Sequence, residues 1–553
     1  MSFSTVLKPK YFFIATLLGM IGFYLFTNIG LGPDALSSDV WGYQFLELQK
    51  RFNYWSDVPP SYNQSEYYIG FPLFYYLNPG LEKGLANYHA LSILIIILTY
   101  LVTGFVAQKI FNNWYLASLA GLLVLIPRFI FPTRIGLLDL GSLRGNILAA
   151  PFYFLLSYYW LIYGIKNHHL NILLGLVAGA LVYIYPPAGI ITIFTYGVTA
   201  LVLYRGQSIK PLIFFTFAYL VITTPFWINH FGNPNTSMLE VSAHLSAEEI
   251  AAHSEIIQYK FRGSGFLKTV DFAEIKRGIW DGAPLIAAFI LSMITLGRKR
   301  DQIFEKEKLL TRINISITAT TLAFIALIEI LNYQAISRGG LPVFIDHLRP
   351  MRAIGFVLVM QSVVFVSLLV KNKKQIFALI FAILLIITPI RFSAPLIRIA
   401  VRMTVPESIR LKYNLAPIVR EADYPDFENL QLIAHWTKEN LLQSTTKIFV
   451  FDEHQDEFRF KLISRHNTNL TNKEGNLWVT SGFENSQKWY AERMKYKAQV
   501  SEAKSFESII DFALELDSTH ILLPRGRFSE LYEKSNKTLP VIYENSDYRI
   551  LEL

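Results

Sequence analysis

The sequence predicts a polytopic α-helical membrane protein that ends in an extracytoplasmic α/β domain. Of its 553 residues 52% are hydrophobic and only 17% are charged, whereas a soluble chain carries about a quarter charged residues. The apolar residues gather in runs of about 16–22, the length that crosses a bilayer as a helix. These observations exclude a soluble protein. The chain has no cysteine, which excludes disulfides and thiolate metal sites.

About eleven apolar segments are predicted to span the membrane. The first has no small-residue cleavage site behind it, so we expect a retained span and not a signal peptide. The predicted spans are 11–31, 89–110, 114–132, 145–165, 170–185, 188–204, 211–229, 283–297, 312–333, 352–370 and 376–391. Residues 1–391 are therefore predicted to form the transmembrane domain.

The basic residues orient these spans. Loops rich in Lys and Arg fall on one side if the N-terminus is cytoplasmic, including Arg298-Lys299-Arg300 and Lys371-Asn372-Lys373-Lys374. Cytoplasmic loops carry such an excess, so we expect a multi-pass plasma-membrane protein with residues 392–553 outside. The topology accounts for the net charge of +9, and no nucleic-acid partner is expected.

Two large outer loops are predicted to hold helices. In loop 32–88, apolar residues recur at helical spacing from Val40 to Leu48, which predicts a helix along the membrane interface. In loop 230–282, Ser246-Ala-Glu-Glu249 has the pattern of a capping box that opens a helix.

The C-terminal domain alternates between helix and strand patterns. Helices are predicted at 431–441 and 505–516, and strands at 447–452, 520–525 and 548–553. This alternation predicts a small α/β domain with a partly parallel sheet.

Asp34 and Asp39 lie just outside the first span and are the first candidate catalytic residues. A carboxylate at the water–lipid boundary can accept a proton from an attacking hydroxyl, or hold a divalent cation such as Mg²⁺ or Mn²⁺. The alternative for Asp39 is a cap for a helix that starts at Val40. The two roles are compatible, because a helix start is also well placed for a site.

Two outer-face groups of basic residues are candidates for phosphate binding. Arginine binds phosphate oxygens through a planar fork of donors, and basic charge on this side is not explained by topology. The alternatives are an interfacial Arg–Asp pair and contact with lipid headgroups. The first group is Arg134, Asp139 and Arg144, and the second is Arg338, Asp346, His347, Arg349 and Arg352.

Glu329 is placed near the outer end of the span 312–333. A carboxylate inside a span is costly and is by default a functional candidate. The alternative is a side chain that reaches the membrane surface.

The layout as a whole resembles the GT-C superfamily of membrane glycosyltransferases. An acidic first outer loop, many spans and an outer tail carry this resemblance, and AHWTKENLLQSTTKIFVFDE and THILLPR are similar to the tails of several members. The resemblance implies that Asp39 or Asp34 is the key carboxylate, acting as base or metal ligand. It also implies a donor sugar on polyprenyl phosphate or pyrophosphate, held by Arg349, Arg352, Arg338 or Arg144.

The chain departs from the family in two motifs. The C-terminal domain has no WWDYG-like sequence, so it does not resemble an oligosaccharyltransferase proper. The first loop carries Asp34-x4-Asp39 in place of a compact Asp-x-Asp. Because of these departures, the resemblance does not decide between Asp34 and Asp39 as the catalytic carboxylate, nor whether the reaction depends on a metal ion.

Three hypotheses follow for function. The first is a glycosyltransferase that moves a sugar from a lipid-linked donor to a lipid, glycan or protein acceptor on the outer face. The second is a flippase or transporter of lipid-linked glycans, which predicts charged span centres and repeated halves. The third is a non-catalytic scaffold of envelope glycan assembly.

Overall fold

The computed structural model describes most of the chain, and every structural statement below concerns these residues. They are 8–28, 38–55, 86–126, 128–130, 133–135, 150–184, 186–232, 245–260, 272–298, 302–337, 351–390, 427–451, 456–471, 474–475, 478, 482–501, 503, 505–525, 527–535 and 538–553.

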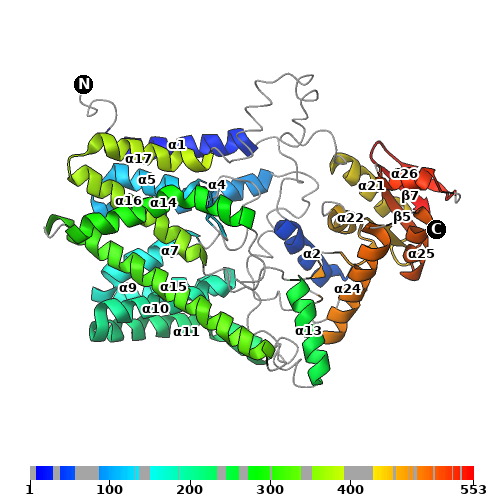
Figure 1. Cartoon of the computed structure of the whole chain (residues 1–553), viewed down its shortest axis with the longest axis horizontal. Helices are drawn as coiled ribbons and strands as arrows, with labels where there is room; N and C mark the ends of the chain where they lie inside the picture. The colour runs from blue at the N-terminus through cyan, green and yellow to red at the C-terminus, as the bar shows by residue number, and fades with distance from the viewer. Residues whose placement is uncertain are drawn as a thin grey trace.

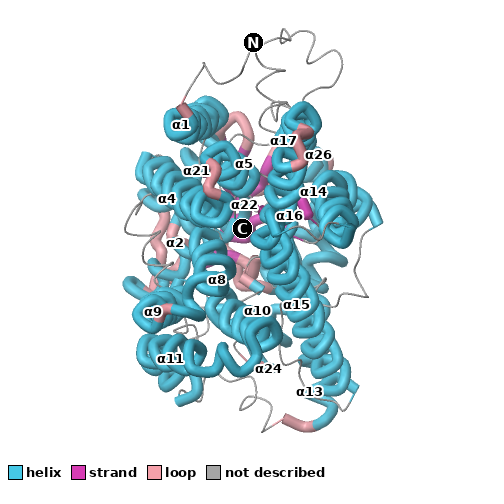
Figure 2. The backbone as a smooth tube through the Cα atoms, turned by 90° about the vertical axis from the view of Figure 1, so that its left-hand side faces the viewer, coloured by secondary structure: helices cyan, strands magenta, loops and turns pink. Residues whose placement is uncertain are grey.

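A bundle of helices fills one half of the molecule (Figure 1). Figure 2 views many of them end-on, with α1 at one edge and α9 and α11 toward the other. The helical elements of the bundle are α1 (Pro9–Asn28), α4 (Ala86–Phe111), α5 (Trp114–Leu125), α7 (Ala150–Phe154), the π-helical η6 (Leu155–Trp160), α8 (Leu161–Tyr163), η7 (Gly164–Lys166), α9 (His168–Ile184), α10 (Pro186–Tyr204), η8 (Arg205–Ser208), α11 (Ile209–Gly232), α14 (Phe272–Arg298), η9 (Gln302–Phe304), α15 (Glu305–Ser337), α16 (Met351–Lys371) and α17 (Gln375–Ile390).

Each predicted span overlaps a helix of this bundle, and the span 145–165 corresponds to the continuous run from α7 to η7. Four described stretches are long and apolar enough to cross a membrane: Ala86–Phe111, Thr192–Ile228, Glu305–Gln334 and Ala353–Lys371. The chain is thus a membrane protein. How many helices cross, and in which direction, stay predictions.

Small residues let two neighbouring helices of the bundle approach closely. Gly175 and Gly179 on α9 face α11, where an added Cβ at Gly175 would collide with the carbonyl oxygen of Phe215. At Gly179 a Cβ would lie 2.8 Å from the Cβ of Ile222. Glycines four residues apart are a common device for close helix packing in membranes.

A buried network of neutral polar side chains joins further helices. The Tyr158 hydroxyl donates to Asn314 Oδ1 at 2.7 Å, and Asn314 Nδ2 donates to Gln361 Oε1 at 2.6 Å. Gln361 Nε2 then donates to Thr311 Oγ1 at 3.0 Å and to the hydroxyl of Ser292. Every side chain in this set is buried, so the network links η6, α14, α15 and α16 from inside.

The other half of the molecule is built on a five-stranded sheet of order β4-β3-β5-β7-β6. β3 pairs in parallel with β4 and β5, and β7 pairs antiparallel with β5 and β6. The partly parallel sheet predicted from the sequence is therefore confirmed. Its strands are β3 (Lys447–Val450), β4 (Asn467–Thr468), β5 (His520–Pro524), β6 (Val541–Glu544) and β7 (Tyr548–Glu552).

Helices cover this sheet, and two of them match the prediction. The helices predicted at 431–441 and 505–516 appear as α21 and α25, whereas α22, α24 and the strands β4 and β6 were not predicted. The helical elements here are α21 (Phe427–Asn440), α22 (Asp456–Ser464), α24 (Phe483–Tyr496), the π-helical η10 (Lys497–Ser501), α25 (Phe506–Glu515) and α26 (Arg527–Glu533). The predicted boundary near residue 392 lies outside the described residues.

Two helices from the predicted outer loops lie between the bundle and the sheet: α2 (Ser38–Phe52) and α13 (Ala247–Lys260) (Figure 1). A short hairpin of β1 (Arg128–Ile130) and β2 (Thr133–Ile135) follows α5 and packs against α14 and α16. These elements carry or flank the candidate site.

Candidate functional site

Asp39 lies in the first turn of α2. The helix begins at Ser38, so Asp39 is its second residue and not the cap of a helix that starts at Val40. An acidic residue in the first helical turn interacts favourably with the helix dipole. The structure describes the backbone of Asp39, which fixes its place on the helix next to the bundle.

Buried aromatic rings dock α2 onto the C-terminal domain. Trp41 and Phe45 are fully buried. The ring of Trp41 meets Phe427 edge-on at a centroid distance of 5.7 Å, and the ring of Phe45 meets Phe458 at 5.2 Å. Phe45 also stacks on Trp55 at 4.2 Å. The apolar face predicted for an interfacial helix is therefore covered by the C-terminal domain at Trp41 and Phe45.

Basic side chains on or next to α22 face these same rings. The Arg459 guanidinium carbon lies 5.9 Å from the Trp41 ring centroid, and Lys461 Nζ lies 5.9 Å from that of Phe45. Arg465, directly after α22, lies 5.3 Å from the ring of Tyr54. Cations at this range over an aromatic face are attracted by its electron density. Aromatic groups of the first outer loop and cations of the C-terminal domain thus form one contact.

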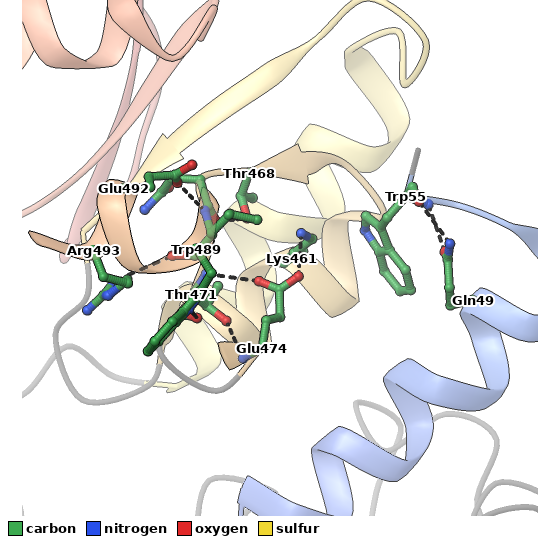
Figure 3. Close-up of polar contacts among 11 residues, drawn as sticks. Gln49, Trp55, Lys461, Thr468, Thr471, Glu474, Trp489, Glu492 and Arg493 are labelled. Atoms are coloured by element: carbon green, nitrogen blue, oxygen red, sulfur yellow. Dashed lines mark hydrogen bonds and ion pairs between the residues drawn. The ribbon is translucent and has the colours of Figure 1, made fainter. Parts of the chain in front are cut away.

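Hydrogen bonds fix the end of α2 as well. The Gln49 side chain bonds both backbone groups of Trp55: Nε2 donates to its carbonyl at 2.8 Å, and its N–H donates to Oε1 at 3.0 Å (Figure 3). From the C-terminal domain, Gln443 Nε2 donates to the carbonyl of Tyr54 at 3.1 Å. The helix that carries Asp39 is held at both ends of its docking face.

The second outer-loop helix, α13, begins with the predicted capping box. The Ser246 N–H donates to Glu249 Oε2 at 2.8 Å, and the Glu249 N–H donates to Ser246 Oγ at 3.3 Å. The hydrogen bond from the Ser246 backbone lowers the pKa of the Glu249 carboxyl. The prediction of a helix that opens at this motif is confirmed.

α13 docks on α24 of the same C-terminal domain. His253 packs on Phe483 with ring centroids 5.7 Å apart, and Tyr259 meets Tyr490 edge-on at 5.0 Å. Lys260 Nζ lies 5.2 Å from the ring centroid of Trp489. Both of the loops predicted to lie outside thus contribute a helix that rests on the C-terminal domain.

A buried ion pair of the C-terminal domain lies near Trp489 and faces Phe45 of α2 (Figure 3). Lys461 Nζ and Glu474 Oε1 are 2.7 Å apart, and both side chains are 0% exposed. Glu474 Oε2 accepts the Thr471 N–H at 2.9 Å, and the Glu474 N–H donates to Thr471 Oγ1 at 3.1 Å. The Trp489 indole N–H donates to the Thr471 carbonyl at 3.1 Å. A charged pair without solvent is stable only with such additional bonds.

One more carboxylate lies close to this pair. Glu492 Oε1 accepts the backbone N–H of Leu470 at 2.6 Å. Burial raises the pKa of the Glu492 carboxyl, and the Leu470 hydrogen bond opposes that shift. Glu492 is therefore a partly buried carboxylate beside the ion pair.

One candidate arginine from each group lies on a described element, and these two elements pack against each other. Arg134 pairs with Phe129 across the hairpin, and β2 packs against α16, whose second residue is Arg352. On α7, which follows the segment of Arg144, Tyr153 stacks on Phe356 of α16 at 5.2 Å. The backbones that carry Arg134 and Arg352 are therefore neighbours, and the helix after Arg144 meets the same end of α16.

Glu329 is half-buried on α15, inside the stretch Glu305–Gln334 that can cross a membrane. Its position toward the C-terminal end of that stretch agrees with the prediction. The remaining candidates, Asp34, Asp139, Arg144, Arg338, His347 and Arg349, lie outside the described residues. Within the described part, no cluster of three or more His, Asp or Glu side chains could hold a metal ion.

Sequence reasoning missed Lys461 and Glu474. Thr471-Asn-Lys-Glu474 has the same capping-box pattern as Ser246-Ala-Glu-Glu249, and that signal could have pointed to Glu474. Nothing in the sequence pairs it with Lys461, thirteen residues earlier, because the contact depends on how α22 packs.

No protein-family model matches the chain, and no curated protein matches its sequence. Among solved structures, the chain is similar to the archaeal oligosaccharyltransferase AglB from Archaeoglobus fulgidus in complex with an inhibitory peptide and a dolichol-phosphate. The two are 14% identical, with 93% of this chain and 69% of that chain covered, at a TM-score of 0.41.

A second similar structure is ArnT from Cupriavidus metallidurans in the apo state. It is 12% identical, with 98% of this chain and 97% of that chain covered, at a TM-score of 0.39. Both proteins are GT-C superfamily glycosyltransferases, the superfamily that the sequence resembles. Both TM-scores are low, so the proposals below depend on this chain's own residues.

Proposed function

We propose that this chain is a membrane glycosyltransferase that works on the outer face of the plasma membrane. It transfers a sugar from a polyprenyl phosphate or pyrophosphate donor to a lipid, glycan or protein acceptor. The observation that carries this proposal is the anchoring of α2, which holds Asp39 in its first turn and lies between the bundle and the C-terminal domain. Positioning of the reacting groups supplies a large part of catalysis.

In the proposed reaction, an acceptor hydroxyl oxygen attacks the anomeric carbon of the donor sugar. The bond from that carbon to the phosphate oxygen breaks, and polyprenyl phosphate or pyrophosphate leaves with the electron pair. Asp39 takes the hydroxyl proton, with Asp34 as the second candidate for this role. The donor's apolar tail would lie between the helices of the bundle.

The arginines would bind the donor and stabilise the charge that develops on the departing phosphate, where fixed positive groups help most. Arg134 and Arg352 support this role best, because the backbones that carry them are neighbours. The proposed phosphate-binding set is Arg134, Arg144, Arg338, His347, Arg349 and Arg352, with Asp139 and Glu329 as further polar candidates. In the alternative role, Asp34 and Asp39 would instead hold a divalent cation such as Mg²⁺ or Mn²⁺, which would add positive charge at the phosphate.

The test is a donor panel with the full chain in lipid nanodiscs. Labelled polyprenyl-phosphate and polyprenyl-pyrophosphate sugars are added with a membrane extract as the source of acceptor. Labelled product together with free polyprenyl phosphate or pyrophosphate is the expected result. If no donor in the panel is consumed, the proposal is wrong for those donors. Movement of intact donor across vesicle membranes without turnover would instead identify the flippase hypothesis.

A further inference from the structure

We propose that Lys461 and Glu474 are positioning residues that fix the two outer-loop helices, α2 and α13, as one unit on the C-terminal domain. The proposal rests on the proposed function in one respect: the unit would set the place of Asp39. The two residues touch no substrate in this scheme. They act through the helices that dock on them.

A continuous series of contacts supports the link. On one side, Lys461 Nζ faces the ring of Phe45 on α2. At the centre, Lys461 pairs with Glu474, and Glu474 and Thr471 bond each other twice. On the other side, Trp489 donates to the Thr471 carbonyl and belongs to the buried cluster that contains Ile256 and Ile257 of α13.

Burial makes this connection sensitive to change. The Lys461 and Glu474 side chains have no exposed area, so water cannot replace either partner if one moves. Phe45 and Trp489 are fully buried as well. A shift of α2 that carries Phe45 away from Lys461 is therefore transmitted to the hydrogen bonds between Thr471 and Glu474, and from there to Trp489. Closely packed interiors transmit strain in this way.

The chemistry at the centre differs from the chemistry at the rims. Ring stacking and cation–ring contacts can slide, whereas an ion pair with reciprocal backbone bonds has one good geometry. The ring and cation–ring contacts on the two sides let each helix dock, and the buried ion pair between them sets their common position. This is the reason to assign the positioning role to Lys461 and Glu474 and not to the rings around them.

The test is hydrogen–deuterium exchange of α2 and α13 amides in the full chain in nanodiscs. The variant is Lys461→Met with Glu474→Gln, which removes both charges, preserves volume and keeps an acceptor for Thr471. The control is Lys495→Met with Glu515→Gln, an exposed ion pair of the same domain. In the double variant we expect the amide exchange rates of both α2 and α13 to rise at least about tenfold, equivalent to about 1.4 kcal/mol. The exchange rates of β5 and β7 should stay unchanged in this variant, and all of these rates should stay unchanged in the control.

Faster exchange in only one of the two helices, or in neither, would overturn the link. If the amides of β5 and β7 also exchange faster, the double variant has loosened the whole domain. The same measurement is then made on Phe45→Leu in place of the double variant. This change removes the ring that Lys461 faces on the α2 side and leaves both members of the ion pair in place. The proposal then requires faster exchange in α13 as well, and an unchanged α13 overturns it.

A kinetic measurement addresses the positioning role itself. In the double variant we expect kcat for sugar transfer to fall while KM for the donor stays within about twofold, because the phosphate-binding arginines are elsewhere. A change confined to KM would argue against positioning of Asp39. If the wild type transfers no sugar, the proposed function fails, but the exchange experiment still decides whether the two helices are linked.

Discussion

The bundle and the C-terminal domain both contain buried polar networks, but only the latter is charged at its centre. In the bundle, Tyr158, Asn314 and Gln361 link helices through neutral hydrogen bonds. In the C-terminal domain, Lys461 and Glu474 form a fully buried ion pair. Charges inside a membrane are costly, so neutral groups suit the bundle, whereas the C-terminal domain can bury an ion pair with enough supporting bonds.

The bundle does contain an ion pair, and its place supports this contrast. Lys371 Nζ at the end of α16 lies 2.7 Å from Glu307 Oε1 in the first turn of α15. The Lys371 side chain is 30% exposed. Ser367 donates to the same carboxylate. The pair therefore lies at an end of these helices, where a lysine reaches solvent, and not at their middle. Within the described part of the bundle, this charged pair lies at the helix ends, whereas the network of Tyr158, Asn314 and Gln361 is neutral.

The largest expected effect on stability comes from Lys461→Met alone. This change leaves the Glu474 carboxylate buried without its cation, which costs about 3–5 kcal/mol in comparable pairs. Denaturant unfolding of the C-terminal domain, followed by its tryptophans, measures the loss. The double variant Lys461→Met with Glu474→Gln is the control and should be clearly more stable than the single one. Equal stability of the two would contradict the idea that the unpaired charge is the cause.

A smaller loss is expected for the neutral network. Gln361→Met removes the acceptor of Asn314 Nδ2 and the donor to Thr311, which costs about 1–2 kcal/mol for buried groups left unpaired. Thermal unfolding in nanodiscs measures it. The double variant Gln361→Met with Asn314→Leu should lose less stability than the sum of the losses of the two single variants, because the two residues share one hydrogen bond. A strictly additive result would show that they act separately.

The pH dependence of the C-terminal domain should depend on Glu492. Burial raises the pKa of its carboxyl in the folded state above the ordinary 4.5, so folding favours the protonated form. Its contribution to stability is complete below pH 4.5 and is lost as pH rises through the folded pKa. Glu492→Gln, which cannot ionise, should therefore gain stability over wild type as pH rises above 4.5. No change in this difference with pH would contradict the assignment.

The smallest effect is expected at the capping box of α13. Glu249 has a lowered pKa because of the hydrogen bonds with Ser246, so its support of the helix start is present above pH 4.5 and is lost as pH falls through the folded pKa. Glu249→Gln, which cannot ionise, should increase amide exchange in the first turn of α13 at neutral pH and abolish that pH dependence. Glu255→Gln, an exposed change later in the same helix, is the matched control.

The sequence predicted much of the fold because local patterns carry it. Apolar runs marked the helices of the bundle, Ser246 and Glu249 marked the start of α13, and the apolar strands at Lys447–Val450 and His520–Pro524 marked the sheet. β4 is only two residues long and has no pattern to detect. β6 is only four residues long, and two of the four are exposed.

The candidate site was predictable only in part. Asp39 and the arginines stood out because charge beside a membrane span requires a reason, and the resemblance supplied one. The docking of Trp41 on Phe427 and the pairing of Lys461 with Glu474 were not predictable. They join residues through tertiary packing of aromatic and charged groups, and neither spacing nor periodicity specifies such partners.

The most direct test of the proposed function is the rate of sugar transfer by Asp39→Asn beside wild type in the same nanodiscs. The Glu255→Gln variant controls for the loss of one outer-face carboxylate. If Asp39 accepts the proton, its variant should lose about a hundredfold or more in kcat, while Glu255→Gln retains the wild-type rate. Transfer by Asp39→Asn at the wild-type rate would contradict the central claim and move the base to another carboxylate.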